Sequence, residues 1–248
     1  MGYIIAVAGK GGTGKTTITA LLVRLIKEKK LGSLLAIDAD PNSNLGEVLG
    51  LKTEVTIGSI LDTISTNPES LPEGMTKDRF IEYKVQTAIQ EAEGFDLLTM
   101  GRPEGPGCYC FVNNCLRSVM TKLIDDYDYI IIDNEAGLEH LSRRTTRYAD
   151  TLLVISNATP VGLRAASRIR DIVKELKIKT KKNLLLINCF DQELEKEKLL
   201  GMDLNYLGSL AFDEEINQIS LNGNSLIKLN KDSITFNRLR KIGEKIWA

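Results

Sequence analysis

The sequence of 248 residues has little net charge and no long apolar run. Its 32 basic and 33 acidic residues nearly cancel, so no global field favours nucleic acid as a partner. Apolar runs such as Ile130–Ile132 are far shorter than the ~20 residues of a membrane-spanning helix. The chain opens on a strand-like segment instead of a basic, apolar leader. We therefore expect a cytoplasmic protein that binds neither nucleic acid nor membrane.

Cysteine and histidine are also scarce, with four and one respectively. Disulfides are rare in a reducing compartment, so closely spaced cysteines are better explained by metal binding or redox chemistry. Cys108 and Cys110, one residue apart, form such a pair. Cys189 follows an apolar run and is expected in the core. His140 stays off the list of expected metal ligands.

Short apolar runs alternate with longer segments of helical spacing along the chain, which predicts an α/β fold. Because the runs are continuously apolar, we expect strands buried on both faces, in a doubly wound, mostly parallel sheet of about seven strands. A single domain spans 1–248, with a less regular insertion around 52–94. The expected strands are Tyr3–Ala8, Leu34–Asp38, Phe95–Met100, Tyr129–Asp133, Thr151–Ser156, Asn183–Asn188 and Tyr206–Ala211; the expected helices are Thr16–Lys29, 112–124, Gly137–Tyr148, Val161–Lys174 and Ile234–Trp247.

The C-terminal helix carries an apolar stripe from Ile234 to Trp247. A helix lying on a membrane surface could use such a stripe, but docking onto the sheet is its commoner use.

A phosphate-binding loop follows the first expected strand. The spacing Gly9-x4-Gly14-Lys15-Thr16 is complete and is followed by a helix, which distinguishes it from a chance glycine-rich turn. Inward-turned N–H groups and the helix N-terminus bind phosphate, Lys15 reaches the β- and γ-phosphates, and the Thr16 hydroxyl suits Mg²⁺. This P-loop pattern predicts a nucleotide-binding protein, a P-loop NTPase. The expected nucleotide-binding residues of the loop are Gly11, Gly12, Thr13, Gly14, Lys15, Thr16 and Thr17.

Lys10 is a second lysine that this geometry leaves unexplained. The motif Gly9-Lys10-Gly11-Gly12-x-Gly14-Lys15-Thr16 resembles the deviant Walker A motif of a family of septum-site and plasmid-partition ATPases, arsenite-pump ATPases and nitrogenase iron proteins. The resemblance implies that ATP lies between the subunits of a homodimer and that Lys10 reaches the partner's nucleotide during catalysis, as an arginine finger does in trans. A solvated surface lysine is the alternative.

Acidic residues end two of the expected strands. The run Ile130–Ile132 followed by Asp133 is a Walker B pattern, which holds magnesium through water. The resemblance implies that Asp38 supports Mg²⁺ and that Asp40 positions or activates the attacking water. A helix N-cap is the alternative for Asp40. Glu135 is equally compatible with a nucleotide-sensing switch and with a surface acid.

Asn188 ends a late apolar run, where the resembling family commonly places a base-reading asparagine. An amide both donates and accepts hydrogen bonds, which suits a purine edge. The run Asn188-Cys189-Phe190-Asp191 also has the spacing of a guanine-reading element, with cysteine in place of its lysine. That substitution and the deviant Walker A motif favour ATP over GTP.

The Cys108/Cys110 pair narrows the resemblance. A helix is expected just after the pair, and a thiol at a helix start has a lowered pKa, favouring the metal-binding thiolate. With this pair and the run from Asp133 to Thr145, the chain is similar to the nickel-insertion accessory ATPases of carbon monoxide dehydrogenase and acetyl-CoA synthase. The resemblance implies a nickel site shared across the homodimer, although thiolates also accept zinc. A structural role in a turn is the alternative for the pair, and Cys115 is either a third ligand or helix packing.

Two further functions remain open at this point. One is an ATP-dependent electron donor like the nitrogenase iron protein, but the cluster cysteines of that family are widely separated in sequence. The other is a partner-binding switch like the septum and partition ATPases, which leaves the Cys108/Cys110 pair unexplained.

Overall fold

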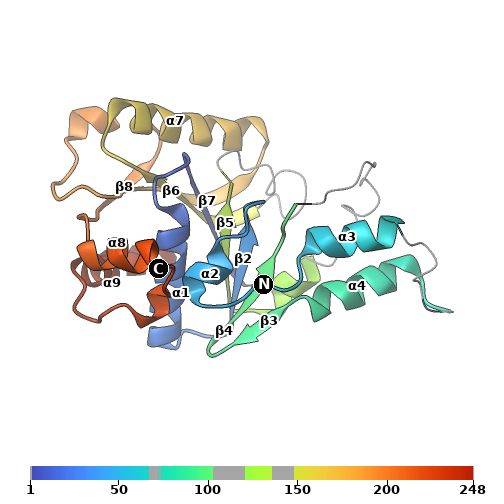
Figure 1. Cartoon of the computed structure of the whole chain (residues 1–248). Helices are drawn as coiled ribbons and strands as arrows, with labels where there is room; N and C mark the ends of the chain where they lie inside the picture. Colours follow the sequence, from blue (N-terminus) through green and yellow to red (C-terminus); the bar gives the residue numbers. More distant parts are fainter. Residues whose placement is uncertain (1, 67–71, 73, 103–120, 136–147, 248) are drawn as a thin grey trace.

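The computed structural model describes residues 2–66, 72, 74–102, 121–135 and 148–247. Its strands form one sheet in the order β3-β4-β2-β5-β1-β6-β7-β8 (Figure 1). Neighbouring strands pair in parallel except β3 with β4. The strands are β1 (Tyr3–Gly9), β2 (Leu34–Ala39), β3 (Gln90–Ala92), β4 (Phe95–Thr99), β5 (Tyr129–Asn134), β6 (Tyr148–Ser156), β7 (Lys179–Ile187) and β8 (Asn205–Ser209). The predicted doubly wound, mostly parallel sheet is confirmed, in a single α/β domain.

Helices cover both faces of this sheet. Helices α1, α2 and α9 pack on one face, and α7, α3 and α4 belong to the hydrophobic cluster of the other (Figure 1). Helices α3 and α4 extend away from the body beyond the β3–β4 end of the sheet. The described helices are α1 (Lys15–Lys29), α2 (Leu45–Leu49), α3 (Ile57–Thr66), α4 (Lys77–Thr87), α7 (Pro160–Glu175), α8 (Glu214–Leu221) and α9 (Ile234–Trp247), with 3-10 turns η2 (Lys196–Leu199) and η3 (Leu226–Lys228).

The central strand β1 shows why apolar runs predict this architecture. Successive side chains of a strand point to opposite faces. Ile4 and Ala6 join the cluster under α7, whereas Ile5 and Val7 join the cluster under α1, and all four are fully buried. Both faces must therefore be apolar, which removes the alternation of a half-exposed strand.

One prediction of local structure is wrong, and the sequence patterns did not reveal two further elements, β3 and α8. Tyr148 opens β6 instead of ending a helix, because its strand pairs with the start of β7 at Lys179. The segment 52–94 holds α3, α4 and the edge strand β3. Strand β3 has only three residues, all at least partly exposed, so it carries no recognisable strand pattern in the sequence. Helix α8 was not predicted at all.

The C-terminal stripe docks onto the sheet, as expected. Phe236, Leu239 and Ile246 are fully buried against α1 and the sheet, but Ile234 at the start of the stripe is 70% exposed. Within the described residues, no helix has the length and apolar character needed to cross a bilayer.

A buried arginine joins α1 to the C-terminal elements. Arg24 is 4% exposed, and its guanidinium donates to the carbonyl oxygens of Leu229 (2.6 Å) and Leu226 (3.3 Å). It also lies 4.3 Å from the centre of the Phe236 ring, while Arg240 lies 4.4 Å from that centre. Desolvated cation–π contacts and charged hydrogen bonds are among the stronger polar interactions. The residue therefore fixes α1 against η3 and α9.

We expect Arg24→Ala to lower the free energy of unfolding by about 3 kcal/mol, because it removes apolar packing, the contact with the Phe236 ring and the hydrogen bond to the Leu229 carbonyl oxygen. For a chain of this size, thermal unfolding should shift down by about 6–12 °C. Arg168→Ala is the control, since Arg168 is an exposed partner of Glu175. Equal melting temperatures for the two variants would contradict this role for Arg24.

Candidate functional site

The loop between β1 and α1 folds back on its own backbone. The backbone N–H and the hydroxyl of Thr13 both donate to the carbonyl oxygen of Lys10, at 3.3 and 2.8 Å. Gly14 has a φ of 87°, and a Cβ at this position would lie 2.4 Å from the amide nitrogen of Asn188. Only glycine fits this close approach in a left-handed backbone conformation. The loop therefore has the compact form that the glycine spacing predicts.

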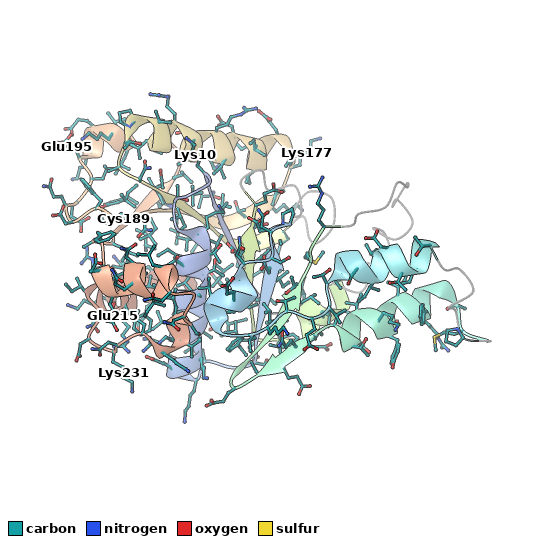
Figure 2. All side chains as sticks on the ribbon, in the orientation of Figure 1. Lys10, Lys177, Cys189, Glu195, Glu215 and Lys231 are labelled. Atoms are coloured by element: carbon teal, nitrogen blue, oxygen red, sulfur yellow. The ribbon has the colours of Figure 1, made fainter. Side chains whose placement is uncertain are left out.

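The two lysines of the loop have different surroundings. Lys15 is 8% exposed, and its ammonium lies 3.5 Å from the carbonyl oxygen of Lys10, so its charge is held within the loop. Lys10 itself is exposed (Figure 2). Beside it, the Cβ positions of Gly11 and Gly12 face open space. The outer side of the loop is therefore accessible to solvent or to a second molecule.

Two buried carboxylates meet at the carboxyl ends of β2 and β5. Asp38 and Asp133 are directly paired in the parallel register, and they are 0% and 1% exposed. Burial raises the pKa of Asp38 to about 7, and the neighbouring Asp133 carboxylate acts in the same direction. Burial also raises the pKa of Asp133 to about 6, although hydrogen bonds from Thr16 and Thr19 oppose the rise. This pair therefore resists carrying two negative charges.

The oxygens of Asp38 also organise the following segment. One accepts the backbone N–H of Asp40 at 3.1 Å, and the other accepts that of Leu45, the first residue of α2, at 2.8 Å. Asp40 caps no helix, because its Oδ1 accepts the backbone N–H and the side-chain amide of Asn42, both at 2.9 Å. The alternative of a helix N-cap at Asp40 is thus wrong. The residue stays partly exposed beside the buried pair.

This corner of the site suits a cation. Bound positive charge removes the repulsion between buried carboxylates and favours their ionised forms. Thr16 adds a hydroxyl next to Asp133. Across the part of the chain that the structure describes, no three His, Cys, Asp or Glu side chains form a ready metal cluster. Two carboxylates and one hydroxyl agree with an ion such as Mg²⁺, which keeps several waters and uses few carboxylates.

Asn188 joins the end of β7 to the phosphate-binding loop. Its side-chain amide nitrogen donates to the carbonyl oxygen of Thr13 at 3.0 Å. One of the two N–H donors of the amide is thus committed, which leaves its second N–H and its carbonyl oxygen available to a ligand.

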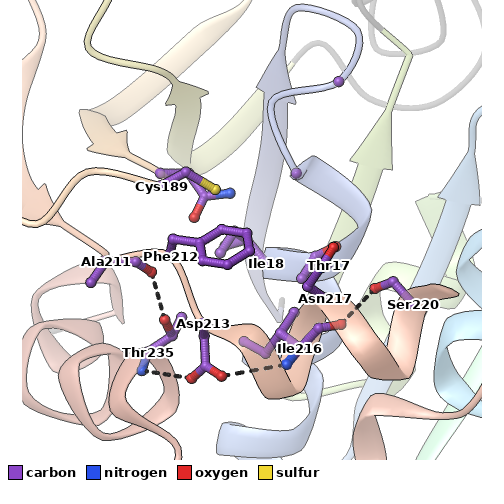
Figure 3. Close-up of a pocket in the computed structure, with 13 residues that line it drawn as sticks. Thr17, Ile18, Cys189, Ala211, Phe212, Asp213, Ile216, Asn217, Ser220 and Thr235 are labelled. Carbon is purple, nitrogen blue, oxygen red and sulfur yellow. Dashed lines mark hydrogen bonds between the residues drawn. The ribbon is translucent and has the colours of Figure 1, made fainter.

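A pocket opens next to Asn188, and it includes residues that the sequence did not single out. Figure 3 shows the ring of Phe212 extending into this pocket, in the direction of α1. Asp213 holds the adjacent turn, because its carboxylate accepts the N–H groups of Glu215 and Thr235 at 3.0 and 3.2 Å. The run Asp213-Glu214-Glu215 is an N-cap followed by an acidic first turn, a signal that could have revealed α8. The lining residues are Gly12, Gly14, Thr17, Ile18, Asn188, Cys189, Ala211, Phe212, Asp213, Ile216, Asn217, Ser220 and Thr235.

Cys189 does not occupy the core as expected. It is exposed at the pocket and has a φ of 53°, because the chain turns sharply where β7 ends. Among the other sequence predictions, Cys108, Cys110, Cys115, Gly137 and His140 lie outside the described residues. Glu135 is half-buried next to the end of β5.

The strand-loop-helix geometry and the paired acids define a P-loop ATPase. A family model described as an AAA domain matches residues 2–186, and the chain belongs to this family. An uncharacterised ATP-binding protein of Methanocaldococcus jannaschii is 43% identical over 98% of both chains. The carbon monoxide dehydrogenase accessory protein CooC of Rhodospirillum rubrum is 31% identical over 86% of this chain and 84% of its own.

Solved structures show the same fold. The septum site-determining protein MinD of Pyrococcus horikoshii, complexed with Mg-ADP, superposes with a TM-score of 0.72 at 22% identity, over 100% of this chain and 96% of its own. The cell division ATPase MinD of Pyrococcus furiosus gives a TM-score of 0.70 at 25% identity, over 99% of both chains.

We expect Asp133→Asn to raise the thermal stability of the nucleotide-free protein. A carboxyl pKa that rises from 3.8 to about 6 on folding makes ionisation less favourable in the folded state, so stability falls as pH rises through this window. The amide removes that penalty, and each 1 kcal/mol gained is worth about 2–4 °C for a chain of this size. The gain, measured by thermal unfolding, should be larger at pH 8 than at pH 5.

Asp150→Asn is the control of opposite sign. Although burial acts to raise its pKa, hydrogen bonds from the Ile4 N–H and from Lys181 hold the pKa of Asp150 below its ordinary value. Its ionised form therefore stabilises the fold, and the amide should lower the melting temperature at pH 8. A similar loss in Asp133→Asn would contradict the electrostatic strain assigned to the buried pair.

Proposed function

We propose that this ATPase is a nickel-insertion accessory protein of carbon monoxide dehydrogenase or acetyl-CoA synthase, acting as a nucleotide-dependent homodimer. The observation that carries the proposal is the 31% identity to CooC, a carbon monoxide dehydrogenase accessory protein, in a chain that also has the Cys108/Cys110 pair. The exposed second lysine of the phosphate-binding loop supports the dimeric arrangement.

ATP is the nucleotide substrate in this proposal. Its phosphates replace the carbonyl contact of Lys15, and its base enters the pocket between Asn188 and Phe212. Thr16, Asp38 and Asp133 would hold Mg²⁺, in part through water, and the ion would supply positive charge against the phosphates.

Asp40 is the residue that we assign to the attacking water. The water oxygen forms a bond to the γ-phosphorus, and the bond from that phosphorus to the β–γ bridging oxygen breaks. ADP leaves with the bridging electron pair, and the water proton passes to the Asp40 carboxylate. Because Asn42 holds Oδ1 of Asp40, the other carboxylate oxygen is the one left to face the water.

Lys10 acts across the dimer in this scheme. Its side chain is exposed beside Gly11 and Gly12, whose Cβ positions face open space, and from there it can add positive charge to the nucleotide of the partner subunit. Positive charge supplied in trans stabilises the charge that develops on the transferred phosphoryl group.

Nickel is the cargo. Cys108 and Cys110 of each subunit would provide four thiolates at the two-fold axis, a set that satisfies Ni²⁺ and also Zn²⁺. If ATP and metal both favour the closed dimer, each raises the affinity for the other by the same factor. Hydrolysis then reopens the dimer and releases the metal to the target enzyme.

A partner-binding switch is the second candidate. The septum site-determining protein MinD of Thermotoga maritima is 30% identical over 94% of this chain and 87% of its own, which favours this reading. It leaves the Cys108/Cys110 pair without a role, so metal content separates the two functions. An iron–sulfur electron donor is distinguished by the same measurement, through its iron and sulfide.

Lys10→Ala should leave the affinity of a subunit for its own nucleotide within about twofold and lower ATP turnover by about a thousandfold or more, because the Lys10 charge acts on the nucleotide of the partner subunit and not on that of its own loop. Nucleotide binding by calorimetry and phosphate release by steady-state assay measure the two effects. Size exclusion with a non-hydrolysable ATP analogue should show loss of the dimer.

Lys196→Ala is the matched control, since Lys196 is an exposed lysine far from the loop in sequence and should leave turnover unchanged. Full turnover by monomeric Lys10→Ala protein would rule out the action in trans.

Anaerobic protein supplied with Ni²⁺ and ATP should bind about one nickel per dimer, because one shared site needs both subunits. Cys108→Ser/Cys110→Ser should lose that metal, as measured by elemental analysis. Cys189→Ser should retain it, since that exposed thiol lines the nucleotide pocket. About four irons with sulfide would instead indicate an electron donor, and a metal-free dimer would favour the partner-binding switch.

A further inference from the structure

An apolar groove with an acidic rim lies between the starts of α8 and α9. Phe212 and Ile234 line it, and their side chains are 56% and 70% exposed. Ile234 begins the apolar stripe of α9 but does not join the core as Phe236 and Leu239 do. Large apolar side chains exposed together are characteristic of interaction surfaces.

The rim of this groove carries unbalanced negative charge. Glu214, Glu215 and Asp232 are exposed, and no lysine or arginine lines the groove. Within the described part of the chain, none of the three carboxylates has a basic side chain at ion-pair distance. Glu215 accepts the backbone N–H of Asn230 at 3.0 Å, which orients the carboxylate without neutralising it.

Asp213, next to this rim, caps the starts of α8 and α9. Its carboxylate accepts the hydroxyl of Ser233 at 2.7 Å and the N–H groups of Glu215, Ile216 and Thr235 at 3.0, 3.4 and 3.2 Å. The starts of α8 and α9 are thus already capped. The three rim acids are therefore not needed as helix caps, and their negative charge is available to attract a positively charged partner.

The groove shares a wall with the nucleotide pocket. Phe212 and Asp213 line both cavities, and Figure 3 shows them on one turn of chain at the entry to α8. A base that contacts the Phe212 ring in its pocket therefore fixes a residue that also forms the floor of the groove.

We propose that this groove docks a basic, amphipathic segment of a partner protein and that nucleotide binding controls its affinity. A large apolar side chain of the segment would pack between Phe212 and Ile234, and lysine or arginine residues would face the rim acids. The charge excludes the other occupants: anionic lipid and nucleic acid are repelled, and two copies of this chain joined at this face would place acid against acid.

The test uses a fluorescent synthetic helical peptide of alternating leucine and lysine clusters, and its counterpart with glutamate in place of lysine. Anisotropy with the full-length protein should show saturable binding of the basic peptide alone. Ile234→Ser and the double variant Glu214→Lys/Asp232→Lys should each weaken it about tenfold, because they remove an apolar anchor or reverse rim charge. Neither variant should change basal ATP turnover, since these residues lie outside the nucleotide pocket.

Leu221→Ser and Glu195→Lys are matched controls, as an exposed leucine at the far end of α8 and an exposed acid elsewhere, and should bind the peptide as wild type does. A non-hydrolysable ATP analogue should tighten peptide binding at least about fivefold, and the peptide should tighten analogue binding by the same factor.

Three results would overturn the proposal. These are no saturable binding of the basic peptide, equal binding of the acidic peptide, and equal loss of binding in the control variants. An affinity independent of nucleotide would overturn the coupling. Concentration-dependent dimerisation that Ile234→Ser abolishes would assign the groove to a second copy of this chain.

Discussion

The pairing of Asp38 with Asp133 is the constraint around which the site is built. Two carboxylates in register on adjacent buried strands are unfavourable by themselves, and burial raises the pKa of both. The fold tolerates them because their oxygens accept hydrogen bonds from Leu45, Asp40 and Thr19. A cation bound at this pair relieves the same repulsion, so cation binding also stabilises the folded protein.

The strand order brings the rest of the site to that pair. Strand β1 lies between β5 and β6, so its carboxyl end, and the phosphate-binding loop after it, stand beside Asp133. The bond from Asn188 to Thr13 then ties β7 to the loop from the other side. Elements distant in sequence thus meet at the carboxyl edge of the sheet, where parallel sheets bind ligands.

Much of this arrangement could be predicted from the sequence, because it depends on short-range signals. Continuous apolar runs identify strands buried on two faces, and the Gly9–Thr16 spacing fixes a loop whose geometry only glycine permits. Asp38 and Asp133 were found because acids directly follow such runs. The hydrogen bond from Leu45 to Asp38 could not be anticipated, since it depends on how the irregular chain between β2 and α2 turns back.

The other features that the sequence does not reveal also depend on how separate parts of the chain come together. The three residues of β3 form a strand only because β4 offers an edge, and Cys189 leaves the core only because the chain turns into a left-handed conformation after β7. Phe212 was overlooked because a lone aromatic residue between β8 and α8 carries no periodic signal. Its place in the pocket is set by Asp213, whose capping bonds hold α8 and α9 together.

Backbone hydrogen bonds link the buried acid pair to a second region of the chain. The carbonyl oxygen of Asp38 accepts the N–H of Met100 at 2.8 Å, and that of Met100 accepts the N–H of Gly58 at 2.8 Å. The end of β4 and the first turn of α3 are therefore fastened to the residue that experiences the charge of the site. Both bonds are short and Met100 is buried, so the acid pair and the start of α3 belong to one hydrogen-bonded part of the core.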